Sequence, residues 1–185
     1  EKAIIRRGDG VCVMSEYMKA QFHEAHPELG DKTIRIIPGG VELDLFHPAA
    51  DRDAARKAVG FPEDRFVILA VRGLKPRQGV DIVIKAMPDI ISAHKDALLV
   101  ISGDGPGRAA LQALVYELKL DGHVRFEGFI DESVLPTYYQ AADISVMPSR
   151  ALEGFGLSTV EALACGAPVV GTPVGGTVEI LRGLD

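Results

Sequence analysis

Two patterns of apolar residues alternate along the chain from about residue 61 to its end. Short continuous apolar runs are typical of strands buried on both faces of a sheet, whereas apolar residues three or four positions apart are typical of amphipathic helices. Strands that alternate with helices predict an α/β fold with a doubly wound parallel sheet. The predicted strands are residues 66–71, 97–101, 123–126, 143–149 and 168–170. The predicted helices are residues 79–94, 108–118, 131–142, 157–165 and 174–181.

Two further features complete the predicted secondary structure. Apolar runs at residues 11–14 and 34–37 predict two short strands, and Ser15 is placed to cap a helix between them. Pro88 lies inside the helix predicted at residues 79–94, where it should kink the helix or divide it into two pieces.

The stretch with the most chemical information is residues 153–166, which follow the predicted strand at 143–149. A glycine-rich turn before a helix presents free backbone N–H groups and the positive end of the helix dipole, which together form an anion site. Glu153 and Glu161 bracket this turn, and carboxylates accept hydrogen bonds from sugar hydroxyls. The pattern therefore suits a ligand with both phosphates and hydroxyls, although a glycine before a helix and a glutamate in its first turn are also ordinary structural features.

Composition narrows the functional class. The chain has 185 residues, of which 47% are apolar, and this suits one domain with a sizeable core. The formal net charge of −6 argues against nucleic-acid binding, and neither a membrane-spanning run nor a signal peptide is visible. Cys12 and Cys165 lack metal-ligand spacing, so we expect buried, reduced thiols of a cytoplasmic protein. The five histidines are not clustered, and we expect no metal site.

Other nucleotide-binding signatures are incomplete. Residues 103–107 contain three glycines but lack the final glycine of the dinucleotide fingerprint and do not follow the first strand. Neither a P-loop nor a nucleophile elbow is present in the sequence. By composition alone, residues 128–130 are a plain turn, Ser149 is a turn residue, and Tyr138 and Tyr139 belong to the core.

Glu153 and Glu161, with seven residues between them, resemble the paired glutamates of the family 4 retaining glycosyltransferases, the large group 1 family. Residues 148–149, 166–170 and 175–176 also fit the pattern of that family. The match covers nearly the whole chain in family order and spacing. The resemblance implies a Rossmann-like fold and the C-terminal domain of a two-domain, GT-B type glycosyltransferase.

The resemblance also implies a division of the chain. Residues 1–37 would be the end of the acceptor-binding N-terminal domain, residues 38–60 a hinge with a short helix, and residues 61–185 the nucleotide-sugar-binding domain. Family members are much longer, so we expect pieces to be missing at both ends, including the C-terminus of the last domain. Without the rest of the acceptor domain, residues 1–37 should be the least securely placed part and should self-associate through apolar side chains. These side chains are Tyr17, Met18, Phe22 and Ile36.

The resemblance assigns roles to individual site residues. Glu153 would hold hydroxyls of the donor sugar and orient it for reaction, and Glu161 would accept hydrogen bonds from the ribose hydroxyls. The backbone of residues 128–130 would read the base edge of the nucleotide. The other contacts expected to the nucleotide sugar come from Gly103, Gly128, Phe129, Ile130, Gly154, Phe155, Gly156 and Leu157.

The loop at residues 71–79 would contact the diphosphate, and the family usually carries an Arg and a Lys there. Gly73 and Gln78 take those two positions in this chain, and Arg72 and Arg77 each lie one residue earlier. We expect Arg77 to supply the catalytic cation, because its planar guanidinium can grip two phosphate oxygens. Arg72 is the second candidate, and alternation along the strand should point it away from the crevice.

The expected function is metal-independent and cofactor-independent transfer of a sugar from a nucleotide diphosphate sugar, such as a UDP- or GDP-sugar, with retention at the anomeric carbon. The partners would be this nucleotide sugar and a sugar, lipid or other acceptor held by the missing domain, and no nucleic acid is expected. The protein would be cytoplasmic, with peripheral attachment of the full-length protein to a membrane left open. Two alternatives stay open: a nucleotide-sugar-binding module without turnover, and a sugar-nucleotide epimerase.

Overall fold

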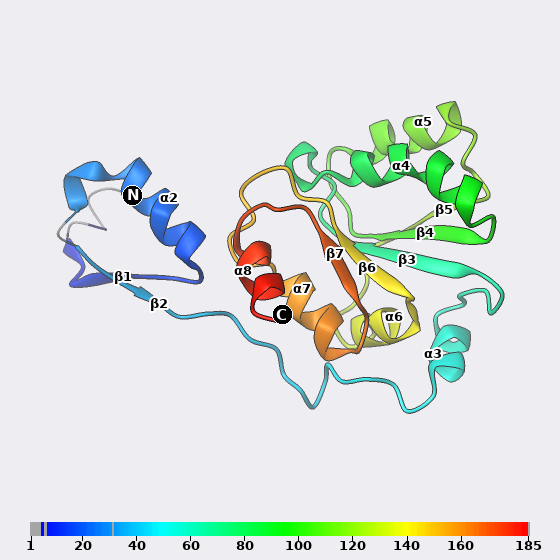
Figure 1. Cartoon of the computed structure of the whole chain (residues 1–185), viewed down its shortest axis with the longest axis horizontal. Helices are drawn as coiled ribbons and strands as arrows, with labels where there is room; N and C mark the ends of the chain where they lie inside the picture. Colours follow the sequence, from blue (N-terminus) through cyan, green and yellow to red (C-terminus); the bar gives the residue numbers. More distant parts are fainter. Residues whose placement is uncertain (1–4, 6, 31, 185) are drawn as a thin grey trace.

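The structure is a computed structural model that describes residue 5, residues 7–30 and residues 32–184 (Figure 1). Its first part is a small β-α-β unit in which two strands pair in parallel. Ser15 caps the helix of this unit as predicted, since its side-chain oxygen accepts a hydrogen bond from the backbone N–H of Met18 at 3.0 Å. The elements are β1 (Gly10–Val13), α2 (Glu16–Ala25), the 3₁₀ helix η1 (Pro27–Leu29) and β2 (Thr33–Ile36).

A segment without helix or strand, residues 37–50, leads from this unit to α3 (Arg52–Ala58). Asp51 caps α3, because its carboxylate accepts hydrogen bonds from the backbone N–H groups of Asp53 at 2.9 Å and Ala54 at 3.0 Å. The short helix expected within residues 38–60 is therefore present.

A buried ion pair fixes α3 to the larger part of the molecule. The guanidinium of Arg56 on α3 pairs with the carboxylate of Asp143 and donates to the carbonyl oxygen of Ala141 at 3.1 Å. The same carboxylate accepts the backbone N–H of Val67 at 2.7 Å. Because a buried charge is costly unless it is paired and hydrogen-bonded, these contacts hold α3 in one position beside the sheet.

The larger part is a five-stranded parallel sheet with strand order β5-β4-β3-β6-β7. Its strands are β3 (Phe66–Val71), β4 (Ala97–Ser102), β5 (Val124–Gly128), β6 (Ile144–Met147) and β7 (Val169–Gly171). The helices that connect them are η2 (Pro76–Gln78), α4 (Val80–Ala93), α5 (Arg108–Glu117), α6 (Leu135–Ala141) and α7 (Leu157–Ala164), and α8 (Gly176–Arg182) follows the last strand.

Alternate residues of the central strand β3 point into two separate cores. Val67 and Leu69 pack in the core that includes Tyr139 of α6, whereas Ile68 and Ala70 pack in the core beneath α4 and α5. Figure 1 shows α4 and α5 on one side of the sheet and α6 and α7 on the other. The predicted α/β, doubly wound, Rossmann-like fold is therefore confirmed, and the apolar strand runs are explained by burial on both faces.

Two local predictions are wrong, and one is wrong in part. The helix α4 continues through Pro88 and is not divided there, while the alternative of a kink stays a prediction. The helix predicted from residue 131 begins only at α6, because the carboxylate of Asp131 accepts the backbone N–H of Ser133 at 2.9 Å and forms a turn. Cys12 is exposed, whereas Cys165 is buried as predicted. Cys12 lies in β1, whose only strand partner within the described residues is β2, so its side chain is not covered by a larger sheet.

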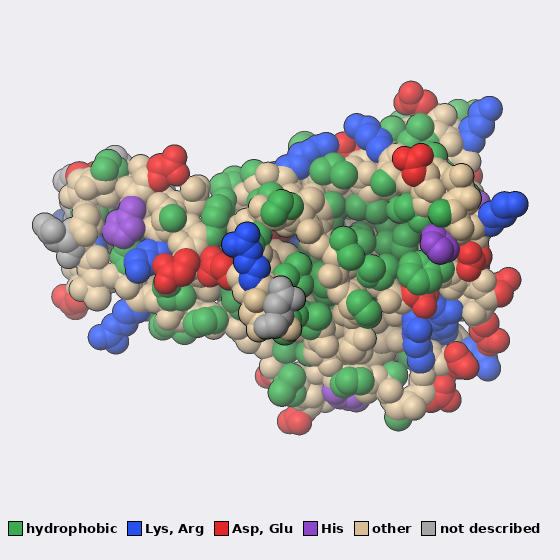
Figure 2. Space-filling view, viewed as in Figure 1, with side chains coloured by type: hydrophobic (Ala, Val, Ile, Leu, Met, Phe, Trp, Pro, Cys, Tyr) green, Lys and Arg blue, Asp and Glu red, His purple; other side chains and the backbone are tan. Residues whose placement is uncertain are grey.

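The surface has no strong charge separation on the face shown. Lys and Arg side chains and Asp and Glu side chains are interspersed over the large unit in the same view (Figure 2). Tyr17, Met18, Phe22 and Ile36 are half-buried rather than fully exposed, and the self-association expected from them stays a prediction. Among the described residues, no helix is both long and apolar enough to span a membrane.

The end of α5 generates a prediction about stability. Lys119 has a φ of 57°, in the left-handed region, and the backbone N–H of Leu120 closes the turn on the carbonyl oxygen of Val115 at 2.9 Å. Glycine is the usual residue at such a helix end, because a side chain strains a left-handed backbone. Lys119→Gly should therefore raise the free energy of unfolding by about 0.5–1 kcal/mol, measured by urea denaturation.

Lys119→Ala is the matched control, because it removes the same charge and side chain but keeps the Cβ atom that causes the strain. It should leave the unfolding midpoint nearly unchanged. Equal midpoints for the glycine and alanine variants would show that the left-handed backbone costs nothing here.

Candidate functional site

The candidate site lies at the carboxyl ends of the strands, where the loops after β3, β4, β5 and β6 meet. Ligands of open parallel sheets bind at this edge. Neighbouring loops are joined by backbone hydrogen bonds: Gly103 donates to Gly128 at 2.6 Å, and Leu74 donates to Asp104 at 2.9 Å. The glycine turns predicted at this edge therefore form one continuous surface.

Close backbone approach holds the loop before α7 in place. Gly175 has a φ of 65°, and a Cβ atom there would lie only 2.0 Å from the carbonyl oxygen of Glu153. The next residue, Gly176, donates its backbone N–H to the same carbonyl oxygen at 2.9 Å. Any side chain at Gly175 would push the loop away, so glycine is required by both conformation and space.

Arg72 and Glu153 form a buried ion pair in the centre of the site. The side chains of Arg72 and Glu153 are 5% and 13% exposed, and the Nη2 atom of Arg72 contacts one carboxylate oxygen of Glu153, Oε2. The same Nη2 atom also contacts the hydroxyl of Ser149 and the amide oxygen of Gln78. Ser149 in turn donates to Oε2 of Glu153 at 2.7 Å. These contacts fix the orientation of the Glu153 carboxylate before any substrate is present.

Two polar atoms of this cluster are left without a protein partner. Within the described part of the chain, the buried Nε atom of Arg72 has no hydrogen-bond partner. The second carboxylate oxygen of Glu153, Oε1, is likewise without a partner among the residues described. The cluster thus fixes one oxygen of Glu153 and keeps the other available for a ligand hydroxyl.

The expected direction of the Arg72 side chain is wrong, and the choice of Arg77 as the catalytic cation stays a prediction. Arg72 was predicted to point away from the site but is buried beside Glu153, whereas Arg77 is exposed and donates to the carbonyl oxygen of Leu152 at 2.9 Å. Strand alternation fails as a guide here because β3 ends at Val71 and the 3₁₀ helix η2 carries Arg77 onto the outer surface. Gly73 is exposed with a φ outside the left-handed region, so a side chain could be accommodated there.

The turn before α7 has the open backbone groups predicted from the sequence. Gly156, the residue before α7, has a φ of 97° and supplies no side-chain cap. Within residues 32–184, no protein atom accepts a hydrogen bond from the backbone N–H groups of Gly154, Phe155, Gly156 or Leu157. Unpaired N–H groups at a helix N-terminus favour an anion.

Two hollows flank the first turn of α7. The first, of about 380 Å³, brings together several predicted residues from separate loops, and Phe129 at its edge is 83% exposed. Its lining includes Arg72, Gly73, Gly103, Phe129, Ile130 and Ser158. The second hollow, of about 220 Å³, is lined by Glu161, Leu157 and Glu132 together with residues 40–42 and 45–46 of the linker. The predicted site residues therefore lie on both sides of one helix end.

Glu161 is held by a core tyrosine that sequence reasoning assigned to packing alone. The hydroxyl of Tyr139 donates to Oε2 of Glu161 at 2.8 Å, and the Tyr139 side chain is fully buried. Burial raises the pKa of Glu161 and outweighs the hydrogen bond from Tyr139, with a smaller contribution from the charge of Glu132. Burial, followed by the charge of Glu161, also raises the pKa of Tyr139, which keeps the tyrosine a hydrogen-bond donor.

Tyr139 and Ser149 are thus the supporting residues that the sequence did not reveal. No sequence motif around Tyr139 or Ser149 distinguishes a residue that supports a glutamate from an ordinary core or turn residue. Tyr139 on α6 pairs with Glu161 on α7, and this pairing depends on the fold. Ser149 and Glu153 lie four residues apart in the loop after β6, and their contact depends on the conformation of that loop.

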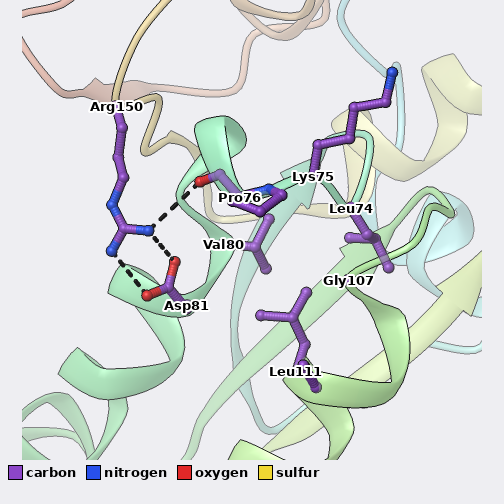
Figure 3. A pocket seen from close by; sticks show the side chains of 9 residues that line it. Leu74, Lys75, Pro76, Val80, Asp81, Gly107, Leu111 and Arg150 are labelled. Atoms are coloured by element: carbon purple, nitrogen blue, oxygen red, sulfur yellow. Dashed lines mark hydrogen bonds and ion pairs between the residues drawn. The ribbon is translucent and has the colours of Figure 1, made fainter.

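A further cavity, of about 230 Å³, lies on the outer side of the β3 loop between α4 and α5 (Figure 3). At the rim of this cavity, the guanidinium of Arg150 donates two hydrogen bonds of 2.8 Å to the carboxylate of Asp81 on α4. Burial tends to raise the pKa of Asp81, but hydrogen bonds and charges from Arg150 and Lys85 lower it overall. This ion pair ties the loop before α7 to α4, and the cavity is otherwise mostly apolar, with none of the predicted site residues in its lining.

Within the residues described, no group of three His, Cys, Asp or Glu side chains converges in a way that could hold a metal ion. The polar groups that do converge are the backbone N–H groups before α7, the Arg72–Glu153 pair and Glu161. This set combines unpaired backbone N–H groups with carboxylates, and its use for phosphates and hydroxyls stays a prediction.

Comparison with known proteins identifies a family. Residues 51–184 match the family model described as Glycosyl transferases group 1. The chain is 36% identical over 182 residues to a GDP-mannose-dependent monoacylated alpha-(1-6)-phosphatidylinositol monomannoside mannosyltransferase from Corynebacterium glutamicum, covering 92% of this chain and 46% of that protein. It is 38% identical over 152 residues to D-inositol 3-phosphate glycosyltransferase 2 from Catenulispora acidiphila, covering 77% of this chain and 35% of that protein. The chain thus spans at most about half the length of these relatives.

Solved structures agree with this assignment. Sucrose-phosphate synthase from Thermosynechococcus elongatus superposes with a TM-score of 0.82 at 35% identity, covering 95% of this chain and 43% of that chain. The Anabaena protein HepE in complex with UDP-glucose superposes with a TM-score of 0.83 at 27% identity, covering 96% of this chain and 49% of that chain. From the family match over most of its length and from its fold, this chain belongs to the group 1 glycosyltransferases and corresponds to the C-terminal half of their two-domain structure.

Proposed function

We propose that this chain is the donor half of a glycosyltransferase, which binds a nucleotide diphosphate sugar and transfers the sugar with retention at the anomeric carbon, without a metal or other cofactor. One observation carries the proposal: a glutamate oriented by a buried arginine lies directly before an open helix N-terminus. The first group suits sugar hydroxyls and the second suits phosphate oxygens.

Each part of the donor has a matching part of the site. The diphosphate would bind the backbone N–H groups of residues 154–157, with the sugar against Oε1 of Glu153. The base would occupy the hollow lined by Phe129 and Ile130, and Glu161 would accept hydrogen bonds from the ribose. A UDP- or GDP-sugar is supported by HepE, solved with UDP-glucose, and by the GDP-mannose-dependent relatives.

The chemistry follows from charge development. As the bond between the sugar and the β-phosphate breaks, negative charge collects on the departing phosphate, and fixed N–H donors stabilise that charge. Arg72 adds a permanent positive charge close to the same turn. The acceptor hydroxyl would arrive from the N-terminal half on the same face of the sugar. Its proton would pass to the departing phosphate.

A binding module without turnover is the second candidate. Gln78 occupies the position where the family carries a lysine, and its amide oxygen is occupied by Arg72. Arg77 faces the surface, so Arg72 is the one guanidinium of this loop that the structure places beside Glu153. The two candidates differ in turnover, and release of nucleotide from the nucleotide sugar by the whole protein with an acceptor extract separates them.

Replacing each glutamate by glutamine should show which part of the donor each carboxylate binds. Glu161→Gln should weaken both the nucleoside diphosphate and the nucleotide sugar, whereas Glu153→Gln should weaken only the nucleotide sugar. Loss of a charged hydrogen-bond acceptor costs about 1.5–3 kcal/mol, or roughly 10- to 100-fold in affinity. Isothermal titration calorimetry with UDP, GDP, UDP-glucose and GDP-mannose measures this difference.

The pH dependence supplies an internal control for this experiment. Because the pKa of Glu161 is raised, lowering the pH from neutral should protonate it and weaken wild-type binding, and Glu161→Gln should not show this loss. Parallel affinity losses for both ligands in both variants would contradict the assignment. Absence of binding of any nucleoside diphosphate to the wild type would overturn the proposed function itself.

Replacement of the two arginines should reverse the order expected from the sequence alone. Arg72→Ala should weaken nucleotide-sugar binding by roughly 10- to 100-fold, because Glu153 loses its charged partner and its orientation. Arg72→Lys should recover little, since one ammonium cannot reproduce the planar fork that reaches Glu153, Ser149 and Gln78.

Arg77→Ala is the control, because it removes an exposed guanidinium from the same loop and loses one hydrogen bond to Leu152. Its affinity should stay within about threefold of the wild type. Calorimetry at one pH, with circular dichroism melts to confirm folding, compares the three variants. A larger loss in Arg77→Ala than in Arg72→Ala would restore the order expected from the sequence.

A further inference from the structure

The N-terminal β-α-β unit is attached to the loop that carries the candidate site. Ser15 is 2% exposed, and its hydroxyl donates to the carbonyl oxygen of Gly154 at 2.5 Å while it accepts the backbone N–H of Met18 at 3.0 Å. One hydroxyl therefore caps α2 and also bonds to the turn before α7. The space-filling view shows the small and large units in contact (Figure 2).

A second contact joins the same helix end to α8. The two carboxylate oxygens of Glu179 accept the backbone N–H groups of Glu16 at 3.0 Å and Tyr17 at 2.8 Å. The first turn of α2 is thus capped by a side chain more than 160 positions away in the sequence. A carboxylate at a helix N-terminus is stabilised by unpaired N–H groups and by the helix dipole.

Side chains of the N-terminal unit and of the linker also pack against the turn before α7. A Cβ atom on Gly154 would lie 3.1 Å from the sulfur of Met18, and a Cβ atom on Gly39 would lie 2.9 Å from the ring of Phe155. Gly154 therefore lies directly under α2, and the ring of Phe155 lies against the linker. The turn before α7 is covered by the N-terminal unit as well as by the α8 end.

The geometry of the peptide bond connects these contacts to the site. The peptide between Gly154 and Phe155 is trans, so its carbonyl oxygen and its N–H point in opposite directions. When Ser15 holds the Gly154 carbonyl, the N–H of Phe155 is directed to the other side of the turn, where it has no protein acceptor within the described residues. Gly176 holds the preceding carbonyl, that of Glu153, in the same manner.

We propose that Ser15 and Glu179 are positioning residues, which dock α2 on the turn before α7 and thereby aim the Phe155 N–H at the diphosphate. This inference rests on the proposed function, and it adds that the N-terminal unit controls diphosphate affinity from outside the donor site. When α2 leaves the turn, the Gly154–Phe155 peptide loses its restraint and the diphosphate loses an oriented donor.

The test compares the affinity of the whole chain for UDP and GDP with its affinity for the corresponding nucleosides, uridine and guanosine. Ser15→Ala and Glu179→Ala should each weaken diphosphate binding by about three- to tenfold and leave nucleoside binding unchanged. Glu179→Gln should recover part of the loss, because it keeps one acceptor oxygen. Ser15→Thr should recover most of it, because threonine keeps the hydroxyl.

Asp51→Ala is the matched control, because it also removes a helix N-cap, that of α3, at a distance from the turn. It should lower stability by a similar amount without changing the ratio of diphosphate to nucleoside affinity. If Ser15→Ala and Glu179→Ala change this ratio no more than Asp51→Ala does, the two residues are merely structural and the inference is wrong.

Amide spectra without nucleotide separate failure of this inference from failure of the proposed function. Ser15→Ala should shift the Phe155 amide resonance and speed its hydrogen exchange, and Ser15→Thr and Asp51→Ala should not. If the wild type binds no nucleotide but the Phe155 amide responds in this way, the proposed function fails while the orienting contact stands. An unchanged Phe155 amide in Ser15→Ala overturns the inference directly.

Discussion

Backbone-to-backbone contact between the loops at the carboxyl edge of the sheet is the constraint on which the site depends. Gly79 lies so close to the loop after β6 that a Cβ atom would be 1.9 Å from the carbonyl oxygen of Pro148, and Gly175 approaches Glu153 in the same way. Each loop is held in place by its neighbour, so none has to be rigid by itself. The resulting edge places polar groups from the loops after β3, β4, β5 and β6 within reach of one ligand, without a long loop that would cost conformational entropy to order.

The buried Arg72–Glu153 pair gives this edge its charge organisation. Removing a charge from water is expensive, and the pair is retained here with hydrogen bonds from Ser149 and to Gln78. The pair orients the Glu153 carboxylate. One of its oxygens is fixed by protein contacts, and the other has no partner among the described residues. Glu161 is held differently, by the neutral hydroxyl of Tyr139, and its pKa is raised by burial. Two glutamates of one motif thus have different electrostatic environments.

Most of the fold followed from the sequence because strands buried on both faces and amphipathic helices leave distinct periodic patterns. The turn before α7 and both glutamates were also predictable, since a glycine-rich turn at a helix start has local causes. Arg72 and Arg77 were not, because their directions depend on where β3 ends and on the turn of η2. Tyr139 was not recognised because the fold brings it to Glu161 from another helix. Ser149 was not recognised because its contact with Glu153, four residues later, depends on the conformation of the loop. The exposure of Cys12 likewise depends on which strands pair with β1.

The hollow beside Glu161 has a wall built from residues 40–42 and 45–46, which precede the sheet domain in the chain. Phe46 of this wall is buried in the same core as Tyr139, the residue that holds Glu161. A recombination point for exchanging acceptor halves between such enzymes therefore lies ahead of residue 40 and not at the first strand of the sheet. A chimera joined at residue 61 would receive a foreign wall for the hollow beside Glu161, together with a foreign packing partner for Tyr139.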